Sequence, residues 1–349
     1  MDSSDWYQIS VVKPQSKHLS NKLQENLAVA VVPNNSLGTL TELVFRIGQV
    51  FGSSRPFIMH PVLHLFAADH GIAEYYKVLQ SKETTAIRVL KFLHDTAPSQ
   101  LFSNTQENNP EIKIIDVGVA HSFEGTLSYW LHHGSKVLSR KMAMGSQSFL
   151  KFPAMQSAAT LKAMETGKKI TESHLRTESN TIGLSAIAEG NTCSVVALTC
   201  ALYNLKPEDV VEESDPKSEL VKQLVNKALR SHPLTHDVVT NLSLYGGFEI
   251  AAICGAILTA AKNQMLIILD GLSAIAALLV AQKINPLAKE YCLLSDCGGA
   301  LQQSLAKRIG INPLLNLELS PSEGTGFSFA LPMLQKSLLL LRQSKDESI

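Results

Sequence analysis

The sequence predicts an α/β fold in which helices flank a mostly parallel, Rossmann-like sheet. Short apolar segments alternate along the chain with segments of helical periodicity, and this alternation is typical of parallel strands joined by right-handed crossover helices. Five of the apolar segments end in an acidic residue followed closely by glycine. Because ligands bind beyond the carboxyl ends of the strands in such sheets, these five ends are candidates for one shared rim.

The predicted strands are short, apolar and bounded by glycine, as fully buried strands are. They cover residues 62–68, 112–115, 181–188, 265–269 and 291–295. Helical periodicity predicts helices over residues 83–94, 157–174, 193–203, 219–230, 249–262, 273–283, 301–309 and 327–341. Before the first strand, Thr39 and Glu42 have the spacing of a capping box that starts a further helix, which Gly52 ends.

The acids at the five strand ends have two explanations that the sequence leaves open. They are Asp69, Asp116, Glu189, Asp270 and Asp296. An aspartate before glycine is common in turns and at helix N-caps, so a single example favours a structural role. Five on one inferred edge favour a ligand site, although some of them are expected to cap helices.

The composition excludes several classes of protein. The 349 residues include 45% hydrophobic and 18% charged residues, enough to bury a large core. Lys+Arg (31) balance Asp+Glu (31), which argues against nucleic acid and anionic membranes as partners, since both attract a basic surface. The five cysteines form no Cys-x-x-Cys pair, and no segment has the pattern of a signal peptide or a membrane span. We therefore expect a soluble protein of the cytoplasm.

No metal or cofactor site is predicted. His60 and His64 are four residues apart, but Pro61 lies between them in a strand approach. His132 and His133 are adjacent and would chelate one ion poorly. The sequence also lacks a Gly-x-Ser-x-Gly nucleophile elbow, a Walker lysine loop and a Gly-x-Gly-x-x-Gly turn. We therefore expect neither hydride transfer nor ATP-driven chemistry.

Two glycine-containing segments are candidates for phosphate binding. Gly190-Asn191-Thr192 opens a predicted helix, where free N–H groups and the helix dipole attract an anion. Gly246-Gly247 leads into another helix, and Lys141 and Lys222 are candidate charge partners. Plain N-capping by Asn191 or Thr192 explains the first segment equally well.

The segment Glu323-Gly324-Thr325-Gly326 combines one carboxylate with a flexible turn. Its glycines let the backbone approach a ligand closely and expose N–H groups, and Glu323 lies at the entrance of the turn. The apolar residues Leu314, Leu315 and Leu317 before it are expected to desolvate Glu323 and raise its pKa. An ordinary solvated glutamate beside a glycine turn is the alternative.

Seven segments, taken together and in order, resemble one known family. They are Phe66-Ala67-Ala68-Asp69-His70-Gly71, Asp116-Val117-Gly118-Val119-Ala120, Phe152-Pro153-Ala154-Met155, Gly190-Asn191-Thr192, Gly246-Gly247-Phe248-Glu249-Ile250-Ala251, Leu269-Asp270-Gly271 and Glu323-Gly324-Thr325-Gly326. The family is nicotinate-nucleotide:dimethylbenzimidazole phosphoribosyltransferase, of the lower-ligand branch of cobalamin synthesis. The resemblance covers roughly residues 36–340.

The resemblance implies a reaction and an architecture. The phosphoribosyl group of nicotinate mononucleotide passes to a ring nitrogen of a benzimidazole-type base, without a metal or cofactor, and Glu323 acts as general base. It also implies a homodimer and a small helical domain built from both ends of the chain. We therefore expect a lead-in over 1–35, the small domain from 36–60 and 327–349, and the large catalytic domain from 61–326.

Site residues follow from the same resemblance. For substrate and phosphate binding it implies Asp69, His70, Lys82, Gly190, Asn191, Thr192, Lys222, Gly246, Gly247, Gly324 and Thr325. The chain departs from the family where substrates are expected: Ala186 replaces a glutamate, Ser320 an arginine, Val78 and Lys82 a serine and a glutamine, and Ser295, Cys297 and Gly299 a histidine, a serine and a glutamate. Lys222 lies one residue away from the position at which the family has a phosphate-binding lysine.

These departures leave two hypotheses of different classes. The first is a divergent phosphoribosyltransferase that acts on nicotinate mononucleotide and an aromatic acceptor base. The second is a catalytically weakened paralogue that binds or regulates an active family member. An active homodimer would exclude the second hypothesis.

Overall fold

A parallel sheet forms the centre of the computed structural model, which describes residues 6–8, 17–29, 38–79, 83–103, 110–123, 137–212, 216–232 and 235–341. Within these residues the sheet has seven strands in the order β3-β2-β1-β4-β5-β6-β7, and every neighbouring pair is parallel. The strands are β1 (Val62–Asp69), β2 (Glu111–Gly118), β3 (Val137–Ser139), β4 (Thr181–Glu189), β5 (Leu266–Leu269), β6 (Cys292–Asp296) and β7 (Pro313–Leu315).

The strand order has the Rossmann pattern. The chain adds strands outward from β1 to β3 on one side and then outward from β4 to β7 on the other, so the order of the strands reverses between β1 and β4. The predicted fold class and the five predicted strands are therefore confirmed. The sequence did not predict β3 and β7, which have three residues each and form the two edges of the described sheet.

The predicted helices are confirmed to within a few residues at each end. The described helices are α1 (Lys17–Val29), α2 (Thr39–Val50), α3 (Thr85–Leu93), α4 (Pro98–Ser103), α6 (Ser157–Leu175), α7 (Asn191–Tyr203), α8 (Pro216–Ser231), α9 (Val238–Tyr245), α10 (Phe248–Lys262), α11 (Leu272–Ile284), α12 (Ala300–Ile309) and α13 (Thr325–Leu338), with shorter turns η2 (Gly71–Leu79), η3 (Pro207–Asp209), η4 (Pro286–Tyr291) and η5 (Leu339–Leu341). Helices α1, α4 and α9 were not predicted.

The start of α2 corrects one detail. The helix begins at Thr39 as predicted, but its N-cap is Gly38, with a φ of 46° and no side-chain capping bond. The predicted capping box of Thr39 and Glu42 is therefore wrong.

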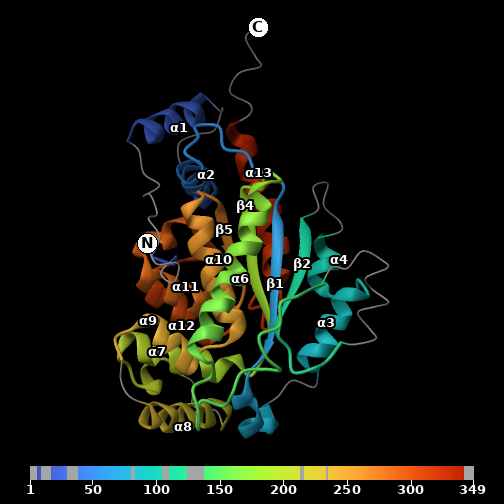
Figure 1. Cartoon of the computed structure of the whole chain (residues 1–349). Coiled ribbons are helices and arrows are strands. Elements are labelled where there is room, and N and C mark those ends of the chain that lie inside the picture. The colour runs from blue at the N-terminus through green and yellow to red at the C-terminus, as the bar shows by residue number, and fades with distance from the viewer. Residues whose placement is uncertain are drawn as a thin grey trace.

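Helices cover both faces of the sheet (Figure 1). On β1, His64 contacts His174 of α6, whereas Leu63 lies against the start of α13 at Gly324. Because successive side chains of a strand point to opposite faces, α6 and α13 lie on opposite sides of β1. Helix α10 packs along α6 and also contacts β1, β2, β4 and β5.

The backbones of α6 and α10 meet directly at two glycines. A Cβ added to Gly167 would lie 1.8 Å from the carbonyl oxygen of Ala252, and one added to Gly255 would lie 2.0 Å from that of Met164. No side chain fits between the helices at either position, so both glycines are required by close packing.

Helix α1 and the last described segments, α13 and η5, lie together away from the carboxyl ends of the strands (Figure 1). Helix α1 packs on α2 and η5, and α13 packs on α2. Leu23 of α1 is fully buried against Gly48 of α2. The expected polar lead-in over 1–35 thus contains a packed helix, and the division into a small and a large domain stays a prediction. No helix among the described residues has both the length and the hydropathy needed to cross a bilayer.

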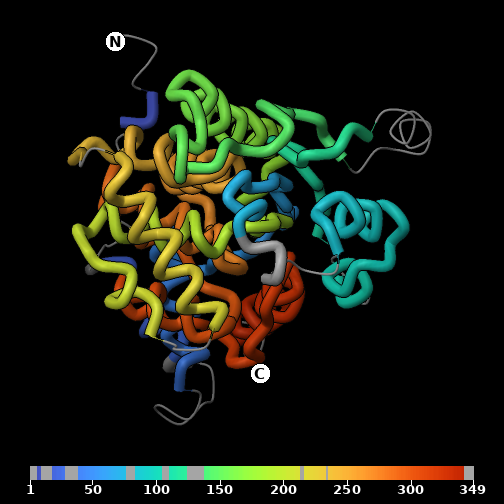
Figure 2. Tube along the Cα trace, turned by 90° about the horizontal axis from the view of Figure 1, so that it is seen from below, coloured from blue at the N-terminus to red at the C-terminus, as the bar shows by residue number. Residues whose placement is uncertain are grey.

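The carboxyl ends of the strands form the opposite end of the molecule. Seen from this end, the segment after β1 lies near the middle, with α3 on one side and α7 and α8 on the other (Figure 2). All five acid-bearing strand ends point to this end, as expected for one parallel sheet.

A buried histidine pair on the α6 face predicts a pH-dependent stability. The Nε2 atoms of His64 and His174 are 2.9 Å apart. Burial, helped by the neighbouring histidine and by Lys113, lowers the pKa of His64, and burial with Lys113 lowers the pKa of His174 despite an opposing effect of Glu111. The unfolded chain then binds more protons at acidic pH, so the free energy of unfolding should fall as pH drops below about 6.5.

Urea unfolding at several pH values between 8 and 5 would measure this loss. The double variant His64→Leu/His174→Leu should show a smaller pH dependence than the wild type, and His236→Leu, at an exposed position, should show the wild-type dependence. Equal slopes for all three proteins would contradict the assignment.

Candidate active site

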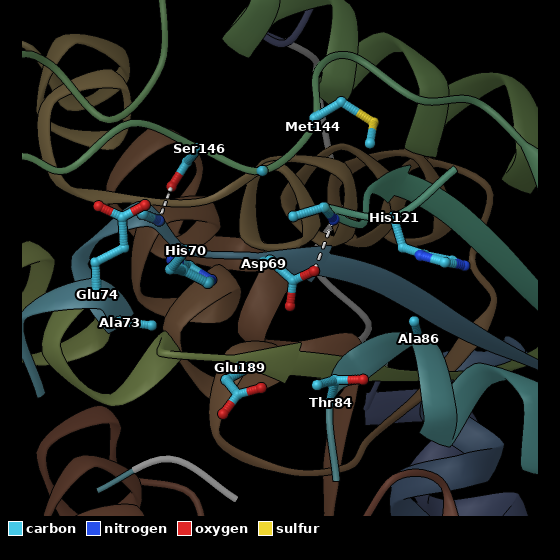
Figure 3. Close-up of a pocket in the computed structure, with 13 residues that line it drawn as sticks. Asp69, His70, Ala73, Glu74, Thr84, Ala86, His121, Met144, Ser146 and Glu189 are labelled. Carbon is cyan, nitrogen blue, oxygen red and sulfur yellow. Dashed lines mark hydrogen bonds between the residues drawn. The ribbon is translucent and has the colours of Figure 1, made fainter. Parts of the chain in front are cut away.

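Three cavities lie at the carboxyl ends of the strands. The β1 cavity, of about 390 Å³, lies at the β1–β4 reversal and is lined by Asp69, His70, Gly71, Ala73, Glu74, Thr84, Ala86, Ala120, His121, Met144, Gly145, Ser146 and Glu189 (Figure 3). The β5 cavity, of about 120 Å³, is lined by Arg88, Ala186, Ala188, Asn191, Thr192, Asp270, Gly271, Leu272, Ser273, Gln302, Leu319, Ser320, Pro321, Ser322 and Glu323. The α8 cavity, of about 230 Å³, is lined by Thr192, Val211, Lys217, Ser218, Val221, Leu272, Gly299, Leu301, Gln302 and Ser320.

The β5 cavity brings together the two segments on which the sequence analysis depended. Glu323 and Asn191-Thr192 line the same space, although they are far apart in the sequence. The β5 and α8 cavities share Thr192, Leu272, Gln302 and Ser320, so they adjoin. An acid and a helix start therefore face one continuous region.

The turn that carries Glu323 is held by a buried aspartate. Glu323 and Gly324 have positive φ angles of 45° and 86°, a conformation that glycine adopts freely but glutamate does not. The N–H of Gly324 donates to Asp270 Oδ2 at 2.6 Å and to Ser185 Oγ at 3.2 Å, and Ser295 Oγ donates to Asp270 Oδ1 at 2.5 Å. Asp270, at the end of β5, thus fixes the backbone conformation of the turn that carries Glu323.

The carboxylate of Glu323 forms an ion pair with Arg88 of α3. Burial raises the pKa of Glu323, and the Arg88 guanidinium opposes that rise. No other hydrogen bond of this carboxylate is found within the described residues, and its side chain is 16% exposed.

Sequence reasoning missed Arg88. It considered Lys82 instead, and Lys82 lies outside the described residues. A usable signal was present, because Arg88 falls on the buried stripe of α3 with Thr85, Val89 and Phe92. A charged residue on the apolar stripe of a helix is rare unless it has a partner.

The apolar segment before Glu323 does not surround it as expected. Leu314 and Leu315 line a different cavity together with Cys297, and Leu317 is 48% exposed. Leu319 is the leucine of this segment that lines the β5 cavity. The expected source of desolvation was therefore wrong, although the carboxylate of Glu323 is largely buried.

His70 belongs to a chain of hydrogen bonds that connects two of the cavities. Its Nε2 lies 2.8 Å from Glu249 Oε1 and its Nδ1 lies 2.7 Å from Ser194 Oγ. Ser273 Oγ donates to the same Glu249 oxygen at 3.1 Å, and Asn191 Nδ2 donates to Ser273 Oγ at 3.0 Å. His70 lines the β1 cavity and Asn191 lines the β5 cavity.

The paired glycines before α10 have a packing explanation. A Cβ on Gly247 would lie 2.3 Å from His70 Cε1, so the loop approaches the imidazole too closely for any side chain. Neither Gly246 nor Gly247 lines the three cavities. Direct phosphate contact by these residues stays a prediction without support from the geometry.

The candidate lysines are arranged differently from the expectation. Lys222 donates to Glu219 at 3.0 Å and does not line the α8 cavity, whereas Lys217 and Ser218 do. Lys141 pairs with Asp116 Oδ2 at 2.9 Å and donates to the carbonyl oxygen of His121, so it holds the loop after β2.

The five acids divide between lining and anchoring roles. Asp69 and Glu189 line the β1 cavity, and Asp69 also accepts the N–H of Ala120 at 2.7 Å (Figure 3). Asp116, Asp270 and Asp296 accept backbone N–H groups of neighbouring loops, and Asp270 also lines the β5 cavity. Turn-anchoring roles are therefore present in part of the set, whereas ligand binding by Asp69 and Glu189 stays a prediction. The helices α7, α11 and α12, which follow Glu189, Asp270 and Asp296, have glycine N-caps without a side-chain capping bond, so these three acids do not cap them.

Four helices begin at the β5 and α8 cavities. The lining residues include the first residues of α7, α8, α11 and α12. The positive ends of four helix dipoles lie there, which makes the region suited to an anion such as a phosphate. Within the described residues no group of three or more histidine, cysteine or acidic side chains could hold a metal ion.

Comparison with known proteins identifies the family of this chain. A family model described as phosphoribosyltransferase matches residues 12–348. The chain belongs to this family. One relative, the nicotinate-nucleotide–dimethylbenzimidazole phosphoribosyltransferase of Cupriavidus necator, is 30% identical over 341 residues and 96% of either chain. The enzyme of that name from Shewanella piezotolerans is 31% identical over 95% of this chain and 96% of its own.

A solved structure supports the fold of this family member. The crystal structure of the Thermus thermophilus protein of the same name superposes with a TM-score of 0.84 at 24% identity, covering 94% of this chain and 96% of that chain. The phosphoribosyltransferase family and the α/β architecture that the sequence resemblance implied are therefore both confirmed.

Proposed function

We propose that this phosphoribosyltransferase transfers the 5-phosphoribosyl group of nicotinate mononucleotide to a ring nitrogen of a benzimidazole-type base, with Glu323 as general base. The observation that carries the proposal is the meeting of Glu323 with four helix starts in adjoining cavities. Glu323 takes the proton that the acceptor base loses, and the helix starts hold the phosphate of nicotinate mononucleotide.

The phosphate is assigned to the α8 cavity and its border with the β5 cavity. Thr192, at the start of α7, and Gln302, in the first turn of α12, line both. Lys217 replaces Lys222 as the proposed cationic partner, because Lys217 lines the α8 cavity. Phosphate held here fixes the ribose, and orientation of the anomeric carbon supplies part of the rate enhancement.

The acceptor base is assigned to the side of the β1 cavity. Thr84 and Ala86 line that cavity, and Arg88, further along the same segment, reaches Glu323. Asp69 and His70 lie on the same side. An acceptor placed between the two cavities would present its N–H to Glu323.

The chemistry requires neither a metal nor a leaving-group acid. The nicotinate ring of the donor is a pyridinium, so it leaves as a neutral ring when its bond to the anomeric carbon breaks. The acceptor nitrogen attacks the opposite side of that carbon, which inverts its configuration, while the carboxylate of Glu323 takes the acceptor N–H proton.

Incubation of the protein with nicotinate mononucleotide and a set of aromatic bases tests the proposal. Chromatography should detect nicotinate and the matching base ribotide in equal amounts. No turnover with any base, together with co-purification of an active family member, would favour the alternative of a binding or regulatory subunit.

We further propose a homodimer of the cytoplasm. Phe102 of α4 and Phe329 of α13 contact each other with ring centroids 4.8 Å apart and ring planes tilted by 45°. They are 42% and 41% exposed, next to the exposed Leu101. An apolar group of this kind is suited to a subunit interface. All five cysteines are free thiols, which fits a reducing compartment. Light scattering after gel filtration would measure the oligomeric state.

The assignment of Lys217 predicts a selective loss of donor binding. Lys217→Ala should raise the Kd for nicotinate mononucleotide about tenfold, because it removes one charge-assisted contact to phosphate. Calorimetric titration would measure this change, with Lys227→Ala, at an exposed position of the same helix, as the control. A larger effect of Lys222→Ala would restore the original assignment.

The buried position of Glu323 predicts an acidic limb in the pH profile. Burial raises the pKa of Glu323 above its usual value of about 4.3, and the general base is active only when ionised. The kcat/KM for the acceptor should therefore be full above the folded pKa and fall as pH drops through it. Initial rates between pH 4.5 and 9 would measure this limb, and a flat profile would contradict it.

A further inference from the structure

The candidate general base is already positioned when no acceptor base is bound. The N–H of Gly324 donates to Asp270 and Ser185, which fixes the turn, and Arg88 pairs with the carboxylate of Glu323. These contacts do not depend on the β1 cavity, to whose side the acceptor base is assigned. Among the described residues, none lines both the β1 cavity and the β5 cavity. Acceptor binding is therefore not needed to assemble the turn that carries the base.

The carboxylate of Glu323 is accessible to water. Its Oε1 pairs with Arg88, its Oε2 has no hydrogen-bond partner within the described residues, and the side chain is 16% exposed. An ionised carboxylate oxygen only accepts hydrogen bonds, so a water molecule beside it donates one O–H to it. A donated O–H is the arrangement that a general base needs to take a proton from water.

The β5 cavity is suited to hold such a water molecule. Its lining includes one amide side chain and four hydroxyl side chains, those of Asn191, Thr192, Ser273, Ser320 and Ser322. A water molecule takes about 30 Å³ of liquid and needs two to four polar partners. The cavity, of about 120 Å³, therefore has both the room and the polar groups for more than one water molecule.

The proposed donor site brings the reacting carbon toward the same water. Phosphate is assigned to the α8 cavity and its border with the β5 cavity, so the anomeric carbon of a bound nicotinate mononucleotide lies toward Glu323. Transferases suppress hydrolysis by excluding water or by assembling the catalytic groups only after the second substrate binds. Here the turn of Glu323 is formed beforehand, and Ser320, which also lines the β5 cavity, is exposed.

We propose that this enzyme also hydrolyses nicotinate mononucleotide to nicotinate and ribose 5-phosphate when no acceptor base is bound. The inference rests on the proposed function, because it uses the same donor and the same general base. The oxygen of a water molecule forms a bond to the anomeric carbon, and the bond from that carbon to the pyridinium nitrogen breaks. The electron pair of the broken bond neutralises the pyridinium, and one proton of the water passes to Glu323.

Incubation of the wild-type protein with nicotinate mononucleotide alone tests the inference. Chromatography should detect nicotinate and ribose 5-phosphate in equal amounts, at least tenfold above a sample without protein. Glu323→Gln should bring this rate close to that of the sample without protein, since a general base contributes about 10²- to 10⁴-fold. Glu318→Gln, at an exposed position of the same segment, should keep the wild-type rate.

Addition of a benzimidazole gives the second arm of the test. A saturating base should replace water as the acceptor, so formation of ribose 5-phosphate should fall at least tenfold while release of nicotinate continues and base ribotide accumulates. Formation of ribose 5-phosphate that the base leaves unchanged, although base ribotide is formed, would overturn the inference, because water and base would then not share one general base.

The remaining outcomes separate this inference from the proposed function. Base ribotide in the presence of a base, without ribose 5-phosphate in its absence, would overturn the inference and leave the proposed function in place. Ribose 5-phosphate whose formation requires Glu323, without base ribotide from any base, would support hydrolysis and overturn the proposed transfer. A hydrolysis rate that Glu323→Gln leaves unchanged would overturn the inference, and the absence of both products would overturn both proposals.

Discussion

Replacing Glu323 by glutamine should lower kcat about 10²- to 10⁴-fold, the range that general bases contribute. The amide cannot take the acceptor proton, but its oxygen can still accept the hydrogen bond from Arg88. The local structure should therefore persist. Single-turnover release of nicotinate in saturating substrate would measure the chemical step directly.

Two controls make this result specific. The Kd for nicotinate mononucleotide and the urea unfolding midpoint of Glu323→Gln should stay near the wild-type values, because the phosphate contacts come from other elements. A kcat within threefold of the wild type would remove Glu323 from the role of general base.

Replacing Asp270 by alanine should cost both activity and stability. The variant leaves the buried N–H of Gly324 without its short hydrogen bond and also removes the acceptor of Ser295. We expect a loss of about 2–4 kcal/mol in the free energy of unfolding from the unpaired groups and the cavity. We also expect about a 10²-fold lower kcat, since a misplacement of about 1 Å at the base has that effect.

The matched variant Asp270→Asn separates anchoring from charge. Its amide oxygen can still accept from Gly324, and its NH₂ can face Ser295, whose hydroxyl also accepts. Asp270→Asn should therefore keep most of the stability and activity that Asp270→Ala loses. Equal losses in both variants would mean that the charge of Asp270, rather than the hydrogen bond, is required.

Much of the sheet was predictable because its central strands are continuously buried. Segments such as 62–68 and 181–188 are covered by helices on both faces and are therefore mostly apolar. Their apolar runs and the glycines that follow them identify them as strands. Strands β3 and β7 pair on one side only within the described sheet and have three residues each, too few for any pattern.

The cavity that holds the candidate site was predictable in part, because the motifs at Glu323 and Asn191-Thr192 line it together. Their roles in catalysis and binding stay proposals. The site was not predictable where the role of a residue depends on a partner distant in sequence. Gly247 has the pattern of a ligand loop, but its actual constraint is the imidazole of His70. The two candidate lysines of α8 lie differently, because residues five positions apart on a helix differ in direction by about 140°. Lys217 lines the α8 cavity and Lys222 does not, and phosphate binding by either lysine stays a proposal.

The glycine contacts between α6 and α10 have a consequence for how ligands enter. Two helices that meet carbonyl to Cα at two separate levels cannot slide past one another without a backbone collision. Shear motion on that face of the sheet is therefore blocked. Structural adjustment to incoming ligands is thus expected on the opposite face, where α3 supplies Arg88. Among the described elements, the larger contacts of α3 with the sheet are those with β1 and β4. We therefore expect the face formed by α6 and α10 to stay rigid and the position of α3 to adjust when ligands bind.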